Sequence, residues 1–394
     1  MADYFLVRPL EELSIRGNRG FGMSGEHGQG QMPPWPSLFA GAFRSAILGR
    51  DPKVLAAFGR DGKQPDGEVG RVLGTPEKPG DFRLTWSSMA LPENTQPGAT
   101  PYKEKKCLPA IPAPEDLVVS EGRQVAMLEP QAPPAGLKVR QELPLVAVHR
   151  SAKPGKPVSG SWLSGAALDS YIKGEIPASV LECKFLYSKS ARVGNALDNG
   201  SRTVRKGMLY SSEQIALKGH AGFLVGIEGL GEARREFLPD VGMLRFGGDG
   251  RAAQYEYMEN QTAAVAPIEQ IGNDRRFKLV IISPGIFAKG WIPDGVERDG
   301  ENWMLRIGGF SARLACAAMG RHDTVSGWDL AKWRPKPASR VVPTGSVYWF
   351  DRVEGQLEQL EQWMKNGIWS GNPDDLLRQV EGFNRAVLAA WPTA

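Results

Sequence analysis

The stretch RVGNALDNGSRTVRKGMLY, residues 192–210, says more about the fold than any other part of the chain. Its centre, DNGS at 198–201, is a strong β-hairpin signal, because a type I′ turn needs the left-handed backbone that Asn and Gly tolerate. We therefore expect two antiparallel strands joined by a tight turn. The arms carry apolar residues that we expect to anchor the hairpin, namely Val193, Leu197, Val204 and Leu209.

Basic side chains interleave with these apolar positions. The four cations are Arg192, Arg202, Arg205 and Lys206. A hairpin with many cations and almost no anions is typical of a segment that meets a phosphate backbone or an acidic partner. A solvated hairpin whose cations only keep it soluble explains the charge equally well. Strand alternation predicts that Arg202 and Lys206 share one face and that Arg205 lies on the other.

Length and composition predict a two-domain α+β protein. The chain has 394 residues, of which 41% are hydrophobic and 23% are charged, so it can bury substantial cores. Its 47 Gly and 30 Pro indicate many turns and long loops. Short strands mix with a few helices, without regular βα alternation. We expect an N-terminal domain over residues 1–220, with a proline-rich insertion and the basic hairpin, and a C-terminal domain over 221–394.

The positive charge is concentrated in two segments. The net charge of the whole chain is only +4. Residues 192–220 carry five cations and two anions, and residues 328–340 carry four cations and one anion. Each segment therefore has a net charge of +3, which leaves the rest of the chain at −2. This distribution is typical of a localised track for phosphates.

A glycine-rich basic loop, RGNRGFG at 16–22, follows the first expected strand. Glycines would let backbone amides and the guanidinium groups of Arg16 and Arg19 approach a phosphate closely, with Phe21 stacked on a base. A simple surface turn is the alternative. The mostly apolar stretch that follows Pro36 predicts a helix that Ser37 caps and that runs to about Leu48. Arg44 is its only charge and either reaches RNA or is an ordinary surface residue.

Tryptophans and cations also interleave near the C-terminus. Trp328, Trp333 and Trp349 alternate with Lys332, Arg334, Lys336 and Arg340. Aromatic rings can stack on bases while cations hold phosphates. The alternative is a structural crossover, and we expect the tryptophans to be mostly core. Upstream, GGDGR at 247–251 predicts a tight turn that presents Arg251 to a phosphate or a partner subunit.

The sequence predicts no catalytic, metal or cofactor site. The four histidines are far apart, and no Cys lies at a ligand spacing from another Cys or a His. The chain contains neither a GxSxG elbow nor a GxxxxGK[ST] phosphate loop. Three scattered cysteines, no export signal and no apolar run of about 18 residues predict a cytoplasmic protein without a membrane span.

The hairpin segment at 192–210 resembles the middle motif of a RAMP-superfamily subunit, subunit three of type III-B (Cmr) CRISPR effector complexes, which caps the 5′ handle of the CRISPR RNA. Four further blocks resemble the same family in the same order. They are FLVRPLEELSIRGNRGFG (5–22), WPSLFAGAFRSAIL (35–48), LRFGGDGR (244–251) and PKPASRVVPTGSVYWF (335–350). The region GWDLAKWRPKPASRVVPTGSVY (327–348) is the most specific, because no common enzyme motif has that form.

This resemblance implies two tandem ferredoxin-like (RRM-like) domains with long loop and hairpin insertions. It also implies a non-catalytic RNA-binding subunit that grips the crRNA 5′ handle. Its partners would be the large polymerase-cyclase-like subunit and the adjacent backbone RAMP subunit. Two alternatives remain: an endoribonuclease that uses His220 to mature the guide RNA, and a purely structural adaptor. The chain departs from the family at 381–384, EGFN, where Asn384 replaces an expected glycine.

Overall fold

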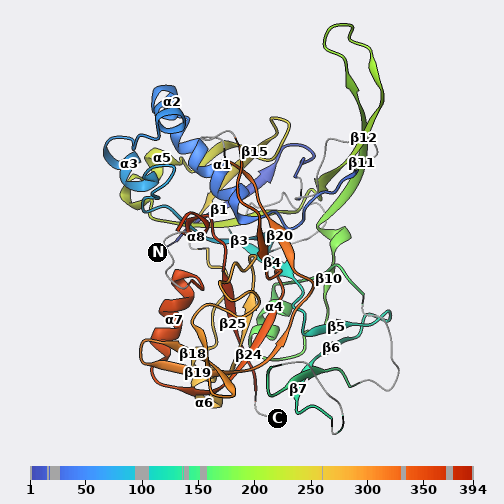
Figure 1. Cartoon of the computed structure of the whole chain (residues 1–394), viewed down its shortest axis with the longest axis vertical. Coiled ribbons are helices and arrows are strands. Elements are labelled where there is room, and N and C mark those ends of the chain that lie inside the picture. The colour runs from blue at the N-terminus through green and yellow to red at the C-terminus, as the bar shows by residue number, and fades with distance from the viewer. Residues whose placement is uncertain are drawn as a thin grey trace.

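The computed structural model describes residues 2–15, 17, 27–93, 106–134, 136, 142–150, 158–259, 261–329, 334–369 and 376–392, with the side chains of 205–207 left out. Two large antiparallel sheets dominate the described chain, and a long hairpin projects from one end (Figure 1). The protein is α+β, as its sequence predicted.

The first sheet has eight strands, and all its neighbouring pairs are antiparallel. In spatial order they are β10 (Leu181–Glu182), β9 (Ser161–Ser164), β4 (Cys107–Pro112), β3 (Arg83–Pro92), β13 (Gly222–Glu228), β1 (Asp3–Pro9), β15 (Ala252–Met258) and β14 (Val241–Arg245).

The second sheet has six strands, also antiparallel throughout. Their order is β17 (Val296–Asp299), β18 (Asn302–Ile307), β19 (Phe310–Ala318), β24 (Val347–Glu354), β16 (Phe277–Ile281) and β25 (Ala386–Ala390). The hairpin pairs β11 (Tyr187–Leu197) with β12 (Val204–Leu217), and the short β2 (His27–Gly28) runs parallel to β12.

Helices and short two-stranded ribbons complete the fold. The α-helices are α1 (Pro36–Leu48), α2 (Pro52–Asp61), α3 (Gly67–Leu73), α4 (Ala166–Ile172), α5 (Arg234–Phe237), α6 (Ile268–Asp274), α7 (Leu357–Asn366) and α8 (Leu376–Val380), and the 3-10 turns are η1 (Cys183–Phe185) and η2 (Gly231–Ala233). The ribbons pair β5 (Leu117–Val119) with β6 (Val125–Met127), β7 (Glu129–Gln131) with β8 (Val146–Val148), β20 (Asp323–Val325) with β23 (Ser339–Val341), and β21 (Trp328–Asp329) with β22 (Arg334–Pro335).

The central strand β1 is buried on both faces, which explains its continuous apolar run. Successive side chains of a strand point to opposite faces. Phe5 and Val7 belong to the core beneath α1, whereas Leu6 belongs to a second core on the opposite face. β1 therefore contributes to two cores at once.

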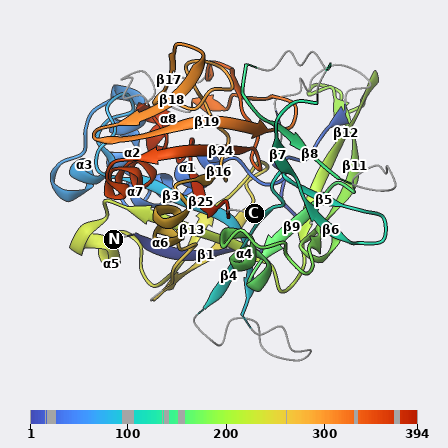
Figure 2. The same cartoon turned by 90° about the horizontal axis from the view of Figure 1, so that it is seen from below.

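That second core joins the two sheets. It combines Leu6 and Leu224 of the first sheet with Val280 and Trp349 of the second. Figure 2 shows strands β19 and β24 of the second sheet stacked over β1 and β13 of the first. On the outer face of the second sheet, Leu279 belongs to a third core, which includes α7. The described chain thus forms helix, sheet, sheet and helix layers.

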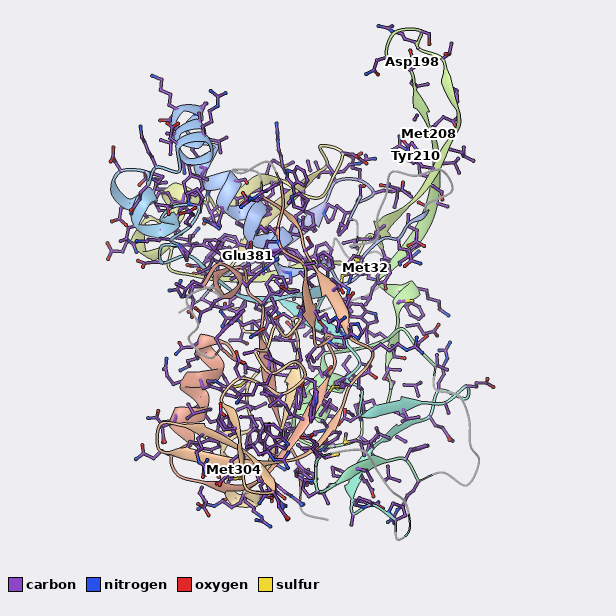
Figure 3. All side chains as sticks on the ribbon, viewed as in Figure 1. Met32, Asp198, Met208, Tyr210, Met304 and Glu381 are labelled. Atoms are coloured by element: carbon purple, nitrogen blue, oxygen red, sulfur yellow. The ribbon has the colours of Figure 1, made fainter. Side chains whose placement is uncertain are left out.

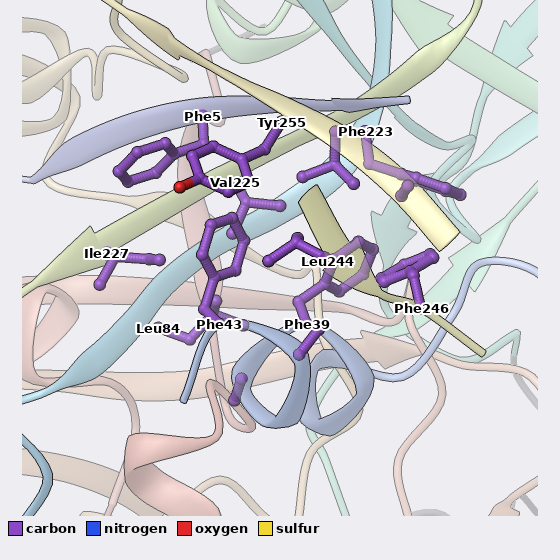
Figure 4. Close-up of a cluster of buried hydrophobic side chains, with 14 of the residues drawn as sticks. Phe5, Phe39, Phe43, Leu84, Phe223, Val225, Ile227, Leu244, Phe246 and Tyr255 are labelled. Atoms are coloured by element: carbon purple, nitrogen blue, oxygen red, sulfur yellow. The ribbon is translucent and has the colours of Figure 1, made fainter. Parts of the chain in front are cut away.

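Helix α1 packs its aromatic side chains against the first sheet. Phe39 and Phe43 are four residues apart and so lie on the same side of the helix. Their ring centroids lie 5.2 Å from those of Phe223 and Phe5, respectively (Figure 4). The expected Ser37 cap is wrong. The N-cap is Trp35, which makes no side-chain capping bond, because Pro36 at the first helical position starts the helix without needing one.

The ferredoxin-like assignment and the boundary at residue 220 stay predictions. Strands β3, β13, β1 and β15 lie in the order expected for that topology, with α1 between β1 and β3 and α5 between β13 and β15. In the second half, β17 and β18 occupy the connection between β16 and β19, where a helix is expected. The first sheet extends past residue 220 to Met258. No helix of the described chain is long and apolar enough to span a membrane.

Candidate nucleic-acid interface

The predicted hairpin is present and projects well beyond the two sheets (Figures 1 and 3). Its apolar residues do not anchor it to a core, contrary to our expectation. Val193 is 63% exposed, and Leu197, Val204 and Leu209 are each more than half exposed. The arms reach past the body of the protein, so these side chains have no core within reach. They form an exposed apolar set on the hairpin.

A glycine–tyrosine contact supports the middle of the hairpin. Gly194 lies opposite Tyr210 in the strand register. A Cβ added to Gly194 would lie only 2.4 Å from the Tyr210 ring, so the ring lies directly over the glycine backbone. Figure 3 labels Tyr210 on the projecting part of the hairpin. This pair was not predicted from the sequence, although an aromatic residue opposite a strand glycine is a recognisable pattern.

The turn of the hairpin differs from the predicted type I′ turn. Only Arg202 adopts a left-handed backbone, with φ of 54°, and Gly200 does not. Asp198 organises the loop instead, because its carboxylate accepts hydrogen bonds from the backbone N–H groups of Gly200 and Ser201, both at 3.0 Å. Such an aspartate-centred turn gives a longer loop than two residues. The predicted alternation fails for Arg202 because it lies in this loop.

The hairpin cations divide into three groups. Arg192 and Arg202 are exposed and have no ion pair with any residue that the structure describes. Lys189 instead forms an ion pair with Glu213 at 3.1 Å. Arg205 and Lys206 lie at the start of β12, but their side chains are outside the described part, so their roles stay predictions.

The base of the hairpin holds the end of the N-terminal loop. Arg16, Arg19 and Phe21 themselves lie outside the described residues. The chain that follows them, β2, pairs with β12 at Ser211 and Ser212. The Gly30 N–H donates to the Glu213 carboxylate at 2.9 Å, and Lys189 Nζ donates to the Gly30 carbonyl at 2.9 Å. The described residues on both sides of the N-terminal basic loop therefore lie at the base of the hairpin, because Leu13 also bridges to Ile215 of β12.

A small cleft lies between the N-terminal and C-terminal motifs. It has a volume of about 250 Å³. Its lining comes from the 31–36 segment, from β3 and β4, from residues 282–284, and from Asp323 and the 341–344 segment. The polar and aromatic lining residues include Gln31, Trp35, Ser87, Ser283, Asp323 and Thr344. The Trp35 indole N–H is buried and finds no hydrogen-bond partner among the described residues. Prolines at 33, 34, 36, 284 and 343 complete a rigid wall.

Of the four cations predicted in the strip at 328–340, Arg334 and Arg340 are exposed, Lys336 is paired, and Lys332 lies outside the described residues. Arg340 is exposed on β23, directly opposite Thr324 of β20. Trp328 is 50% exposed, whereas Trp349 is buried, so the expectation of core tryptophans holds for Trp349 and fails for Trp328. Lys336 does not point freely outward, because it forms an ion pair with the buried Glu381.

Several cations surround the buried carboxylate of Glu381, a residue labelled in Figure 3. Arg378, which was not among the predicted site residues, pairs with it at 3.1 Å, in addition to Lys336. Arg44 lies within electrostatic range of the same group. Burial lowers the pKa of the Arg44 guanidinium, and the charge of Glu381 raises it. Arg44 is therefore half-buried against the C-terminal segment.

Asn384 keeps the left-handed turn that the missing glycine would have provided. Its φ is 56°, and its side chain is fully buried. The Asn384 amide accepts a hydrogen bond from the Ile286 N–H and donates to the carbonyls of Ile286 (3.0 Å) and Ile368 (2.6 Å). A buried side chain cannot touch RNA, so this residue ties the loop to its neighbours.

Arg251 forms an ion pair with Glu11 at the end of the β14–β15 turn. That turn is as tight as predicted, with left-handed Gly247, Asp249 and Gly250. The paired guanidinium is only partly exposed, because its side chain keeps 18% of its accessible area. Its contact with a phosphate or a partner stays a prediction.

Groups that could carry out catalysis are scattered. His220 Nε2 lies 2.8 Å from the Phe185 carbonyl oxygen, which requires that nitrogen to donate its hydrogen. No group of three His, Cys, Asp or Glu side chains that could hold a metal ion occurs among the described residues. Burial raises the pKa of the Cys107 and Cys316 thiols to about 12.

Comparisons with known proteins place the chain in a family. A family model described as CRISPR-associated protein (Cas_Cmr3) matches residues 5–391. One similar structure, the type III-B Cmr-beta complex bound to cognate target RNA and AMPPnP in state 1, has 15% identity and a TM-score of 0.49, covering 96% of this chain and 93% of that one. Another, the same type of complex bound to cognate target RNA, has 16% identity and a TM-score of 0.48, covering 97% and 96%. No curated protein matches the sequence. The family model spans almost the entire sequence, and the chain belongs to the Cas_Cmr3 family of CRISPR-associated proteins.

Proposed function

We propose that this chain is a non-catalytic RNA-binding subunit of a type III-B CRISPR ribonucleoprotein and that it holds the 5′ handle of the crRNA. Membership of the Cas_Cmr3 family supports the CRISPR context. One observation carries the RNA-binding role: strand β2, which follows the N-terminal basic loop in sequence, pairs with the base of the basic hairpin. Arg16, Arg19 and the hairpin cations would then act on one strand of RNA.

Phosphate contacts would come from exposed cations. Arg192, Arg202 and Arg340 are exposed and have no ion pairs with described residues, so no internal carboxylate competes for them. In this proposal further phosphate contacts come from the two basic segments named above, through Arg205 and Lys206 of the hairpin and Arg16 and Arg19 of the N-terminal loop. Phosphate contacts of this kind position an RNA without reading its bases.

A base could be held in the cleft between the motifs. Trp35 offers an aromatic surface, and Asp323 and Ser283 offer hydrogen-bonding groups to the edge of a base. The buried Trp35 N–H lacks an acceptor, which a base or sugar oxygen would supply. Phe21 adds a second stacking group in this proposal.

The exposed apolar residues of the hairpin favour protein partners as well. Val193, Leu197, Val204 and Leu209 would be costly to leave in water in a chain that acts alone. We assign them to contacts with the adjacent backbone RAMP subunit or the large polymerase-cyclase-like subunit. A purely structural adaptor would use the same surface, so these residues do not distinguish an RNA-binding subunit from a structural adaptor.

An endoribonuclease is the less favoured alternative. His220 already donates Nε2–H to a backbone carbonyl, and no cluster of His, Cys, Asp and Glu that could bind a metal surrounds it among the described residues. A general base must lie within hydrogen-bond reach of the proton it removes. Repeat RNA incubated with the pure chain, with and without divalent metal, should therefore remain intact. Cleavage that disappears in His220→Ala would establish the alternative instead.

Co-purification tests the proposed function directly. The chain is expressed with the other subunits of its complex, and the bound RNA is sequenced. We expect CRISPR RNA whose 5′ handle is protected. A complex that assembles normally and protects the handle equally well without this chain would support the structural adaptor.

A further inference from the structure

A second and larger cleft lies on the opposite half of the molecule from the basic hairpin. Its volume is about 1020 Å³, at the upper end of the range of ligand-binding cavities. It separates the β7–β8 ribbon from β18, β19 and the 289–292 loop, and Figure 1 shows these elements at the end away from β11 and β12. The RNA-binding proposal makes no use of it.

Aromatic and aliphatic side chains form most of the lining. They are Leu128, Val146, Ala147, Trp291, Ile292, Trp303, Ala317, Ala318 and Met319. Two hydrogen bonds fix segments of the cleft walls to the second sheet: the Leu145 N–H donates to the Ala315 carbonyl at 3.0 Å, and the Tyr348 hydroxyl donates to the Trp291 carbonyl at 2.6 Å. The cleft is thus built into the fold and does not depend on a ligand to form it.

The charges at the cleft leave one carboxylate available. Glu142 pairs with Arg298 at 3.0 Å, and Lys289 pairs with Glu297. Glu115 is exposed in the cleft and has no ion pair or side-chain hydrogen bond with any described residue. Crowding by the cleft walls desolvates the Glu115 carboxylate and raises its pKa. An incoming cation would relieve that penalty.

The tryptophans of the cleft also suit a cation. Arg298 already lies over the Trp303 ring, with its guanidinium carbon 5.5 Å from the ring centroid. The Trp303 indole N–H is buried and has no hydrogen-bond partner in the part of the chain that the structure describes. A backbone carbonyl of a bound peptide would supply the missing acceptor. Trp291 also lines the cleft, and the face of a tryptophan ring attracts an arginine or lysine side chain.

We propose that this cleft receives an arginine or lysine side chain, flanked by apolar residues, from a polypeptide segment of a partner protein. Among the described residues, the lining and its ion-pair partners supply three carboxylates and two cations, which disfavours the phosphates of RNA. The volume accommodates the basic side chain together with its apolar neighbours. The site lies apart from the cations assigned to RNA and does not rest on RNA binding.

Methyl NMR of the full chain tests this proposal, with the Met319 methyl group as the reporter inside the cleft. The probe is the capped pentapeptide Ala-Leu-Arg-Leu-Ala, and its control replaces the arginine with citrulline, which is nearly isosteric but neutral. We expect saturable shifts of the Met319 signal and at least about tenfold tighter binding of the arginine peptide, as for a charge-assisted hydrogen bond. Glu115→Gln should abolish this preference, and Glu358→Gln, which alters an exposed carboxylate on α7, should preserve it.

Three results would each overturn the proposal. The first is equal binding of the arginine and citrulline peptides, and the second is the absence of a saturable Met319 shift with either peptide. The third is a larger Met319 shift with a uridine pentanucleotide than with the arginine peptide, which would assign the cleft to nucleic acid. Because Glu115 is exposed, its replacement by Gln should not prevent folding.

Discussion

Lys278 Nζ lies 3.0 Å from Asp116 Oδ2, and both side chains are fully buried. The Tyr171 hydroxyl donates to the other carboxylate oxygen of Asp116 at 2.8 Å, and the ammonium lies over the Tyr171 ring at 4.0 Å from its centroid. The three residues come from β16, from the segment between β4 and β5, and from α4. This buried ion pair therefore joins the second sheet to elements that belong with the first.

Replacing the ammonium should be strongly destabilising. Lys278→Met leaves the Asp116 charge buried without a cation, so we expect a loss of about 3–5 kcal/mol in the free energy of unfolding. Urea denaturation measures the loss. Tyr171→Phe is the milder comparison, because it removes one hydrogen bond, worth about 1.5–3 kcal/mol to a charged acceptor. A loss below about 1 kcal/mol in Lys278→Met would contradict a structural role for the pair.

Removing exposed hairpin cations should reduce the salt dependence of guide binding. Each phosphate contact to single-stranded RNA contributes about 0.7 to the slope of log K against log salt. The double variant Arg192→Ala/Arg202→Ala should therefore lower the slope by roughly 1.4. The control is Arg298→Ala/Arg306→Ala, whose cations pair with Glu142 and Asp299. An unchanged slope in the hairpin variant would show that its cations are only solvated.

Handle protection should depend on the N-terminal loop together with the hairpin. Each segment holds few cations, so Arg16→Ala/Arg19→Ala should cost on the order of 1–2 kcal/mol in guide binding. We expect this variant, assembled with the other subunits, to expose the guide's 5′ end to nuclease footprinting. Full protection in the variant complex would place the grip elsewhere, with the segment around Arg340 as the next candidate.

Asn384 should matter for stability and not for RNA binding. Asn384→Gly keeps the left-handed backbone but removes three hydrogen bonds, so it should cost about 1–3 kcal/mol. Asn384→Ala should cost about 1 kcal/mol more, because alanine resists φ of 56°. Thermal denaturation gives the order of the two variants. A weakened RNA affinity in a variant that folds normally would show that this turn contacts the guide.

The two buried thiols should make stability depend on pH above neutrality. Burial raises the pKa of Cys107 and Cys316 to about 12, whereas the thiol of an unfolded chain has a pKa of about 8.5. Between these values the unfolded state releases protons that the folded state keeps. Stability is therefore full below about pH 8.5 and is lost as pH rises toward 12. Urea midpoints at pH 8 and pH 10 should differ less in Cys107→Ala/Cys316→Ala than in the parent.

Reactivity with a thiol reagent at pH 8 provides a separate check. Cys183 is partly exposed, whereas Cys107 and Cys316 are buried. We expect one rapidly modified cysteine in the native chain and three in urea. Rapid modification of Cys107 in the native chain would contradict its burial on β4, in the core that joins the two sheets.

Local signals in the sequence were sufficient for the hairpin but not for its details. The apolar and basic alternation of 192–210 predicted the two strands, because strand pairing depends on near neighbours. It did not predict the turn, since the Asp198 carboxylate competes for the backbone N–H groups and moves the left-handed residue to Arg202. It also misplaced Val193 and Leu209, because periodicity reports an apolar face and not whether a core lies opposite it.

By itself, the sequence determined the α+β class, the strands with continuous apolar runs and the family to which the chain belongs. Those properties follow from residue order, which the chain carries before it folds. Only the tertiary structure decided which cations remain available to bind a phosphate or a partner. Lys336 and Arg378 are bound to Glu381, and Lys278 is buried against Asp116, whereas Arg340 is exposed. Lys336 and Lys278 pair with carboxylates that lie 45 and 162 residues away in sequence. Such distances exist only once the chain has folded, so residue order alone does not reveal these pairs.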